Sequence, residues 1–136
     1  MDEQNADEIC ASESTADDDD ACVLENIEID GDIVFDGTRV VKLVGTAITG
    51  EATIIGAESV VITGSDVQGD LEMLANADAV VTKTSIGATL TLDGGKHGTI
   101  SGNTVHGDLN CSGNGKVEGE GNAVSGSAVN QCAGID

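Results

Sequence analysis

Apolar and polar residues alternate along this chain in a pattern that repeats every 19 residues from residue 29 to the end. The most regular column holds one β-branched residue per repeat: Ile29, Ile48, Val67, Ile86, Val105 and Val124. Two further apolar columns begin at Ile33 and Phe35 and recur with the same period. Because residues two positions apart face the same side of a β-strand, the pattern predicts a strand at 33–35 in every repeat.

A second pair of apolar columns begins at Val41 and Leu43 and predicts another strand at 41–43 in each repeat, weakening toward the C-terminus. Three glycine columns lie between the strands, where we expect the backbone to turn. They contain Gly31, Gly50, Gly69, Gly107 and Gly126; Gly37, Gly56, Gly94 and Gly113; and Gly45, Gly64, Gly102 and Gly121. The period does not divide into equal hexapeptides. We therefore expect an all-β fold, a right-handed parallel β-helix (β-solenoid) of about six 19-residue coils.

A polar column also repeats, directly before the β-branched one. It consists of Thr46, Ser65, Thr84, Asn103 and Asn122. Stacked side chains of these types form hydrogen bonds from coil to coil along a solenoid corner. Such a ladder of similar residues is expected to be structural, because a catalytic site needs different groups that converge on one point.

Acidic residues dominate the charge of the chain, which is -20 in total with 5 Lys and Arg against 25 Asp and Glu. Nucleic acids and anionic lipids need basic patches, so we expect neither as a partner. No apolar run approaches the ~20 residues that span a bilayer, so no membrane insertion is expected. Phe35 is the only aromatic residue, which leaves no platform on which a sugar ring could stack.

Four cysteines without a CxxC motif indicate two disulfides rather than a metal site. Cys22 falls in an inward column, and we expect Cys10 to fold back onto it, pinning residues 10–22. Cys111 and Cys132 lie one coil and two positions apart, so a second bridge is plausible there. A bridge between the two ends would have to span the whole rod. We therefore divide the chain into an acidic N-terminal segment tied by a disulfide, residues 1–22, and a solenoid domain, residues 23–136.

Disulfides favour an extracellular or cell-surface location. The first residues, MDEQNADE, lack the basic and apolar regions of a signal peptide. An exported chain is therefore expected to have lost such a signal.

The sequence V-x-G-D-L at 67–71 and 105–109, followed by GDLNCSGN and GNAVSGSAVNQC, resembles a group of small bacterial secreted β-helix proteins. The resemblance covers residues 22–136 and includes the pair Cys111 and Cys132. It implies the fold, but the function of these proteins is not established, and the resemblance transfers no catalytic residues. A looser similarity links the coils to bactofilins, β-helices that polymerise end to end. The cysteines and the acidic N-terminal segment depart from bactofilins, so the similarity leaves assembly outside the cell as an expectation.

Acidic side chains share one column after the corner glycine, at Asp32, Glu51, Asp70 and Asp108. Carboxylates on successive coils lie about 5 Å apart and repel one another unless cations screen them. A solvated acidic face is the favoured interpretation, and a Ca²⁺-bridged ladder of Asp32, Glu51 and Asp70 is the alternative. No other cofactor is expected.

Two histidines and a threonine column were the remaining candidates for chemistry. His97 and His106 fall in different columns without a metal partner at motif spacing, so we expect surface histidines. The outward column Thr63, Thr82 and Ser101 is explained by β-propensity rather than by an ice-binding array.

The sequence thus favours a non-enzymatic extracellular or cell-surface scaffold that self-assembles end to end into a homo-oligomer or filament. The reason is the end of the solenoid, where strand edges lack a partner. The tail after Cys132 is too short to cover these edges well. The alternative is a monomeric acidic module on the cell envelope that binds a cation or a basic partner. A mimic of DNA is a third and weaker class, because disulfides argue against an intracellular target.

Overall fold

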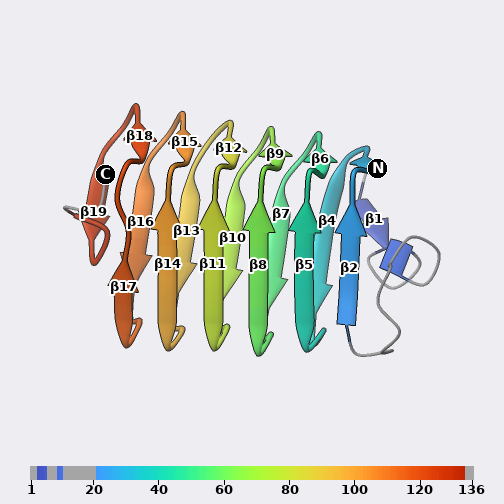
Figure 1. Ribbon diagram of the computed structural model, residues 1–136, viewed down its shortest axis with the longest axis horizontal. Helices are drawn as coiled ribbons and strands as arrows, with labels where there is room; N and C mark the ends of the chain where they lie inside the picture. The colour runs from blue at the N-terminus through green and yellow to red at the C-terminus, as the bar shows by residue number, and fades with distance from the viewer. Residues whose placement is uncertain (1–2, 6–8, 11–20, 134–136) are drawn as a thin grey trace.

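The chain folds into a right-handed parallel β-solenoid, in a computed structural model that describes residues 3–5, 9–10 and 21–133. Each coil contributes one strand to each of three parallel sheets. In Figure 1 the chain ascends the front sheet, crosses over the top and descends the rear sheet while it advances toward the C-terminus, which is a right-handed path. The predicted fold class is confirmed, and the coils are 19 residues apart.

Three sheets make up the solenoid, and we name them by their place in Figure 1. The front sheet contains β2 (Ala21–Glu25), β5 (Val40–Val44), β8 (Ser59–Thr63), β11 (Asp78–Thr82), β14 (His97–Ser101) and β17 (Lys116–Glu118). The rear sheet contains β1 (Glu3–Asn5), β4 (Asp32–Asp36), β7 (Ala52–Ile55), β10 (Leu71–Leu74), β13 (Leu90–Asp93), β16 (Leu109–Ser112) and β19 (Ala128–Asn130). The top sheet contains the two-residue strands β3 (Glu28–Ile29), β6 (Ala47–Ile48), β9 (Asp66–Val67), β12 (Ser85–Ile86), β15 (Thr104–Val105) and β18 (Ala123–Val124).

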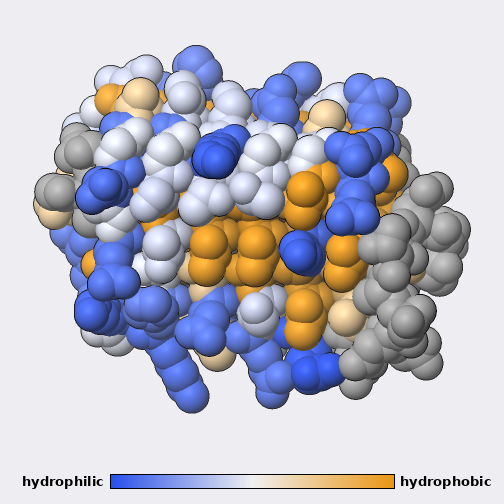
Figure 2. Space-filling view, in the orientation of Figure 1, coloured by the Kyte–Doolittle hydropathy of each residue, from blue (hydrophilic) through white to orange (hydrophobic). Residues whose placement is uncertain are grey.

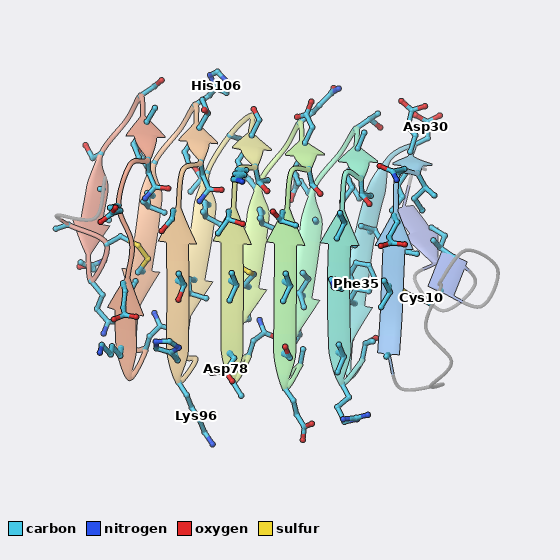
Figure 3. The ribbon with its side chains drawn as sticks, in the orientation of Figure 1. Cys10, Asp30, Phe35, Asp78, Lys96 and His106 are labelled. Atoms are coloured by element: carbon cyan, nitrogen blue, oxygen red, sulfur yellow. A yellow bond between two sulfur atoms is a disulfide. The ribbon has the colours of Figure 1, made fainter. Side chains whose placement is uncertain are left out.

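The predicted inward columns form the core. Alternate residues of each strand are buried because strand side chains point to opposite faces, as in β8, where Val60 and Ile62 are fully buried. Phe35 is 0 % exposed and lies inside the solenoid (Figure 3). Aliphatic side chains of equivalent coils stack directly on one another, for example Leu71 on Leu90. The described part of the chain contains no helix long and apolar enough to cross a membrane.

Both expected disulfides are present, Cys10–Cys22 and Cys111–Cys132, with Cα atoms 5.2 and 5.1 Å apart. Cys22 is fully buried in the first front strand, as its column predicted. Upstream of the bridge, β1 adds an outer strand to the rear sheet, with Glu3 paired to Asp32. The 19-residue pattern, which begins at residue 29, did not predict this strand. Residues 11–20, which the bridge was expected to pin, lie outside the described residues.

Glycines in two of the three predicted columns do turn the backbone through positive φ, from 59° to 83°. The backbone also bends at Gly50, Gly69, Gly107 and Gly126, as expected, but without positive φ; in this column only Gly31 has a positive φ, of 100°. Close approach of the coils favours glycine there, although Ala88 occupies the same column once. A Cβ at Gly69 would lie 2.8 Å from the carbonyl oxygen of Gly50.

Three other residues, Asn26, Ala75 and Lys83, occupy glycine positions of the turning columns with positive φ. Ala75 and Lys83 adopt φ of 57° and 52° where other coils have glycine. The left-handed conformation costs about 1–2 kcal/mol for a residue with a Cβ, and the greater freedom of glycine in the unfolded chain offsets part of that cost. We expect Ala75→Gly and Lys83→Gly each to raise the free energy of unfolding by about 0.5–1 kcal/mol, as measured by urea denaturation.

Ala77→Gly is the matched control for this prediction, because Ala77 lies two residues from Ala75 and has no positive φ. There the substitution adds only flexibility to the unfolded chain and is expected to lower stability. Equal effects of glycine at positions 75 and 77 would contradict the explanation.

Candidate functional site

The predicted polar column forms a buried ladder, as expected. Asn103 is 1 % exposed, and its Oδ1 accepts a hydrogen bond of 2.9 Å from the backbone N–H of Thr84. Its Nδ2 donates to the carbonyl oxygen of Val81 at 2.8 Å and to Oδ1 of Asn122 at 3.0 Å. Thr46 and Ser65 repeat this coil-to-coil pattern. These side chains lie inside the corner and satisfy backbone groups there, so the column is structural and presents no surface to a ligand.

A second buried ladder lies at the opposite end of the front strands and was missed in the sequence. Asn76 accepts a hydrogen bond from the backbone N–H of Ala57 at 2.8 Å, and Asn114 accepts one from Gly95 at the same distance. Their amide nitrogens donate to the carbonyl oxygens of Ile54 and Leu92, in the rear strand of the preceding coil. The only signal was an asparagine in every second coil, alternating with alanine or glycine.

Gln131 completes this second ladder at the C-terminal end. The next position of the ladder is Ala133, which has no amide. Oε1 of Gln131 instead accepts a hydrogen bond of 2.8 Å from the N–H of Asn114, and its Nε2 donates to the Asn114 carbonyl. The neighbouring Cys132 is fully buried by its bridge to Cys111. Gln131 and Cys132 therefore close the last coil, and both precede the short tail that was expected to cover it poorly.

The acidic column lies where the rear strands begin, and its members have different partners. Asp32 accepts a hydrogen bond of 2.8 Å from the N–H of Glu51 on the next coil. Asp70 and Asp108 accept equivalent bonds of 3.0 Å from Thr89 and Ser127. Aspartates on alternate coils thus stabilise the backbone of the coil that follows. Spacing alone did not reveal this contribution.

No three or more His, Cys, Asp and Glu side chains of the described residues are grouped so that they could share a metal ion. Calcium binding by Asp32, Glu51 and Asp70 stays a prediction. Calorimetric titration with Ca²⁺ tests this prediction, and a titration that shows no uptake would contradict it.

The pKa of Glu51, a member of this column, is shifted. Desolvation raises the pKa of its carboxyl group above the ordinary value of 4.5, and the charges of Asp70 and Asp32 raise it further. The folded chain therefore holds this proton more tightly than the unfolded chain. The associated stabilisation is present below pH 4.5 and is lost as the pH rises through the raised pKa.

We expect Glu51→Gln to raise the melting temperature at pH 7 and low salt by about 1–2 °C, because the interactions of exposed charges are small. The difference should disappear in about 1 M salt, which screens the repulsion, and well below the ordinary pKa, where the carboxyl group is neutral. Thermal unfolding followed by circular dichroism measures both. Glu58→Gln is the control, since Glu58 lies 3.4 Å from the Arg39 guanidinium and gains nothing from neutralisation. Equal gains from both variants would contradict the prediction.

The two histidines lie far apart in the fold, as their columns indicated. His106 is exposed after β15 on the top sheet, whereas His97 begins β14 at the lower end of the front sheet, beside Asp78 (Figure 3). His97 Nε2 lies 3.4 Å from a carboxylate oxygen of Glu118. A hydrogen bond from Lys116, supplemented by one from His97, lowers the pKa of Glu118. This cluster is an exposed network of charges at the last complete coil.

The outer surface of the front sheet differs from the rest of the molecule in composition. β5, β8, β11 and β14 contain a single acidic residue, Asp78, at the margin. Four half-exposed valines lie on this surface: Val61 and Val80 in the middle of β8 and β11, and Val40 and Val44 at the two ends of β5. Figure 2 shows them as an apolar patch on the front face, surrounded by hydrophilic side chains. We call the outer surface of these four strands the valine face.

Comparison with known proteins adds no relative to this picture. No protein-family model matches the chain, no curated protein matches it, and no solved structure matches it. The resemblances to secreted β-helix proteins and bactofilins therefore stay predictions, and function has to be argued from the geometry of this chain.

Proposed function

We propose that this protein is a non-enzymatic structural scaffold, extracellular or on the cell surface, whose solenoids associate end to end. The observation that carries the proposal is the C-terminal face. There β17, β18 and β19 end the three sheets, and each is paired on one side only within the described residues. Edge strands expose backbone donors and acceptors that pair readily with another chain.

The two ends of the solenoid match in register. Lys116, which begins β17, follows Ala21, which begins β2, by five full repeats of 19. Ala123 of β18 follows Glu28 of β3 by the same interval. This register is the one that a second molecule needs to continue the front and top sheets, beside the Cys10–Cys22 bridge at the N-terminal end. The shared period supports stacking of successive molecules, as adjacent coils stack within one.

Location and partners follow from charge and cysteine chemistry. Two disulfides support an oxidising compartment outside the cell. The net charge of -20 disfavours nucleic acid and anionic lipid, so a second copy is the favoured partner. Copies of such charge repel one another at low salt, and we expect assembly to strengthen as salt increases.

The second candidate is a monomeric acidic module that binds a cation or a basic partner on the cell envelope. The specific observation in its favour is the group of carboxylates around Glu51, whose charges add to desolvation in raising the pKa of Glu51. A bound cation would relieve that repulsion.

Negative-stain electron microscopy of the oxidised protein over a range of protein and salt concentrations, with and without Ca²⁺, tests the proposal. Filaments are expected at high salt. Single particles under all conditions would overturn self-assembly and leave the binding module.

The variant Val124→Pro shows whether filaments form through the C-terminal face. The N–H groups of Ala123 and Ser125 bond to the preceding coil, so the N–H of Val124 between them points away from the solenoid. Proline removes that donor without breaking a bond within the molecule. We expect a folded protein with an unchanged melting temperature and no filaments. Filaments as abundant as those of the wild type would exclude this face.

A further inference from the structure

Among the three sheet surfaces of the described residues, the valine face carries the fewest acidic side chains, so two copies meet there with the least repulsion. The rear sheet carries Asp36, Glu72 and Asp93 on its outer surface, and the top sheet carries Glu28 and Asp66. Like charges brought together at an interface oppose association strongly. At a net charge of -20, close contact between copies is least opposed at the front sheet.

Removing water from this face costs less free energy where its side chains are apolar or are already hydrogen-bonded to one another. The valines lie half-exposed beside hydroxyl groups that are already bonded, since the Thr82 hydroxyl donates to the Thr63 hydroxyl at 3.0 Å. Such a face offers little to a basic partner, which would be drawn to the acidic surfaces instead. A second copy of the same neutral face suits it better.

The valine face carries one lysine and one carboxylate, and these can pair between two copies of the chain. Lys42 projects from β5, and Asp78 begins β11, two strands away with β8 between them. A two-fold axis along β8 brings β5 of one copy over β11 of the other. Val61 then lies opposite Val61, and each Lys42 lies opposite Val80 of its partner, two residues, or about 7 Å, along β11 from Asp78 and within reach of a lysine side chain. One patch therefore supplies both sides of the contact, as two-fold dimers require.

We propose that the valine face is a lateral docking surface for a second copy of this chain, which pairs solenoids side by side. The four strands cover about 19 by 16 Å, or roughly 300 Å² per copy. Stable interfaces bury about 800 Å² per partner, so a single contact of this kind is weak. This step rests on the proposed end-to-end assembly. In two filaments that lie side by side, the contact recurs at every molecule and gains strength through multivalency. The result is paired or bundled filaments.

Sedimentation equilibrium of Val124→Pro tests lateral pairing separately from stacking, because this variant is designed to block the C-terminal edge. In about 0.5 M salt we expect a reversible dimer with a dissociation constant in the high micromolar to millimolar range. Adding Val61→Glu should weaken the dimer at least tenfold, since two carboxylates then meet on the axis. The matched control is Ile55→Glu, an outward half-buried position of the same coil on the rear sheet, which should leave the dimer unchanged.

The outcomes separate the two proposals. A monomer at all concentrations, or equal weakening by Ile55→Glu, would overturn the lateral surface even if the wild type forms filaments. A dimer that Val61→Glu selectively disrupts would support it even if the wild type forms none. Where filaments do form, Val61→Glu alone should leave them single in electron micrographs while the wild type shows pairs or bundles.

Discussion

Asn103→Ala is expected to destabilise the protein by about 3–5 kcal/mol, because one truncation removes three partners from buried polar groups. The Thr84 N–H, the Val81 carbonyl and the Asn122 amide oxygen all bond to this side chain. A buried polar group left unsatisfied costs roughly 1–3 kcal/mol, and the Thr84 N–H and the Val81 carbonyl each lose this partner. Asn122 Oδ1 keeps its hydrogen bond from the backbone N–H of Asn103. Urea denaturation followed by circular dichroism measures the change.

Asn110→Ala provides the matched comparison. Asn110 lies on the outer surface of β16, half-exposed, and its side-chain hydrogen bond is to exposed Asn130. Its loss should cost less than about 1 kcal/mol, because water replaces the missing partner. Asn103→Thr should recover part of the loss, since threonine occupies the same column at Thr84. If the substitutions at positions 103 and 110 cost the same, the buried ladder does not stabilise the corner as argued.

The double substitution Cys111→Ala and Cys132→Ala is expected to lower the free energy of unfolding by about 3 kcal/mol, the value for a bridge that closes a loop of this length. The loss should be concentrated at the C-terminal end. Burial there is weak, since β17 and β18 have no fully buried residue. Backbone amides of β17, β18 and β19 should exchange with deuterium much faster, as measured by mass spectrometry, because local opening follows low local stability.

Removing the other bridge, with Cys10→Ala and Cys22→Ala, serves as the control. That bridge closes a shorter segment at the opposite end of the solenoid. Exchange at the first front strand should increase, while exchange at β17 to β19 should stay at the wild-type rate. Unchanged protection of β17 to β19 after loss of the Cys111–Cys132 bridge would show that hydrogen bonding by Gln131 closes the last coil without it.

A strict 19-residue period made most of this fold readable from the sequence. Each inward column repeats a few residue types, so a single coil predicts its neighbours, as for Ile62 and Val81. The cysteines could be placed by the same frame, because Cys22 and Cys111 occupy inward columns. The first polar ladder was evident for the same reason, since five consecutive coils carry similar residues at the position of Asn103.

Contacts between coils that do not recur at the same position in every coil were not revealed by the sequence pattern, and only the tertiary structure decided them. Asn76 acts on the coil before it, and Gln131 acts at a position where the repeat has alanine, so neither forms a regular column. The hydrogen bonds of the aspartates depend on how closely the next coil approaches. The valine face likewise emerges only when four strands are set side by side. Periodicity specifies which side of a strand a residue faces, whereas its partners depend on distances between coils that folding alone establishes.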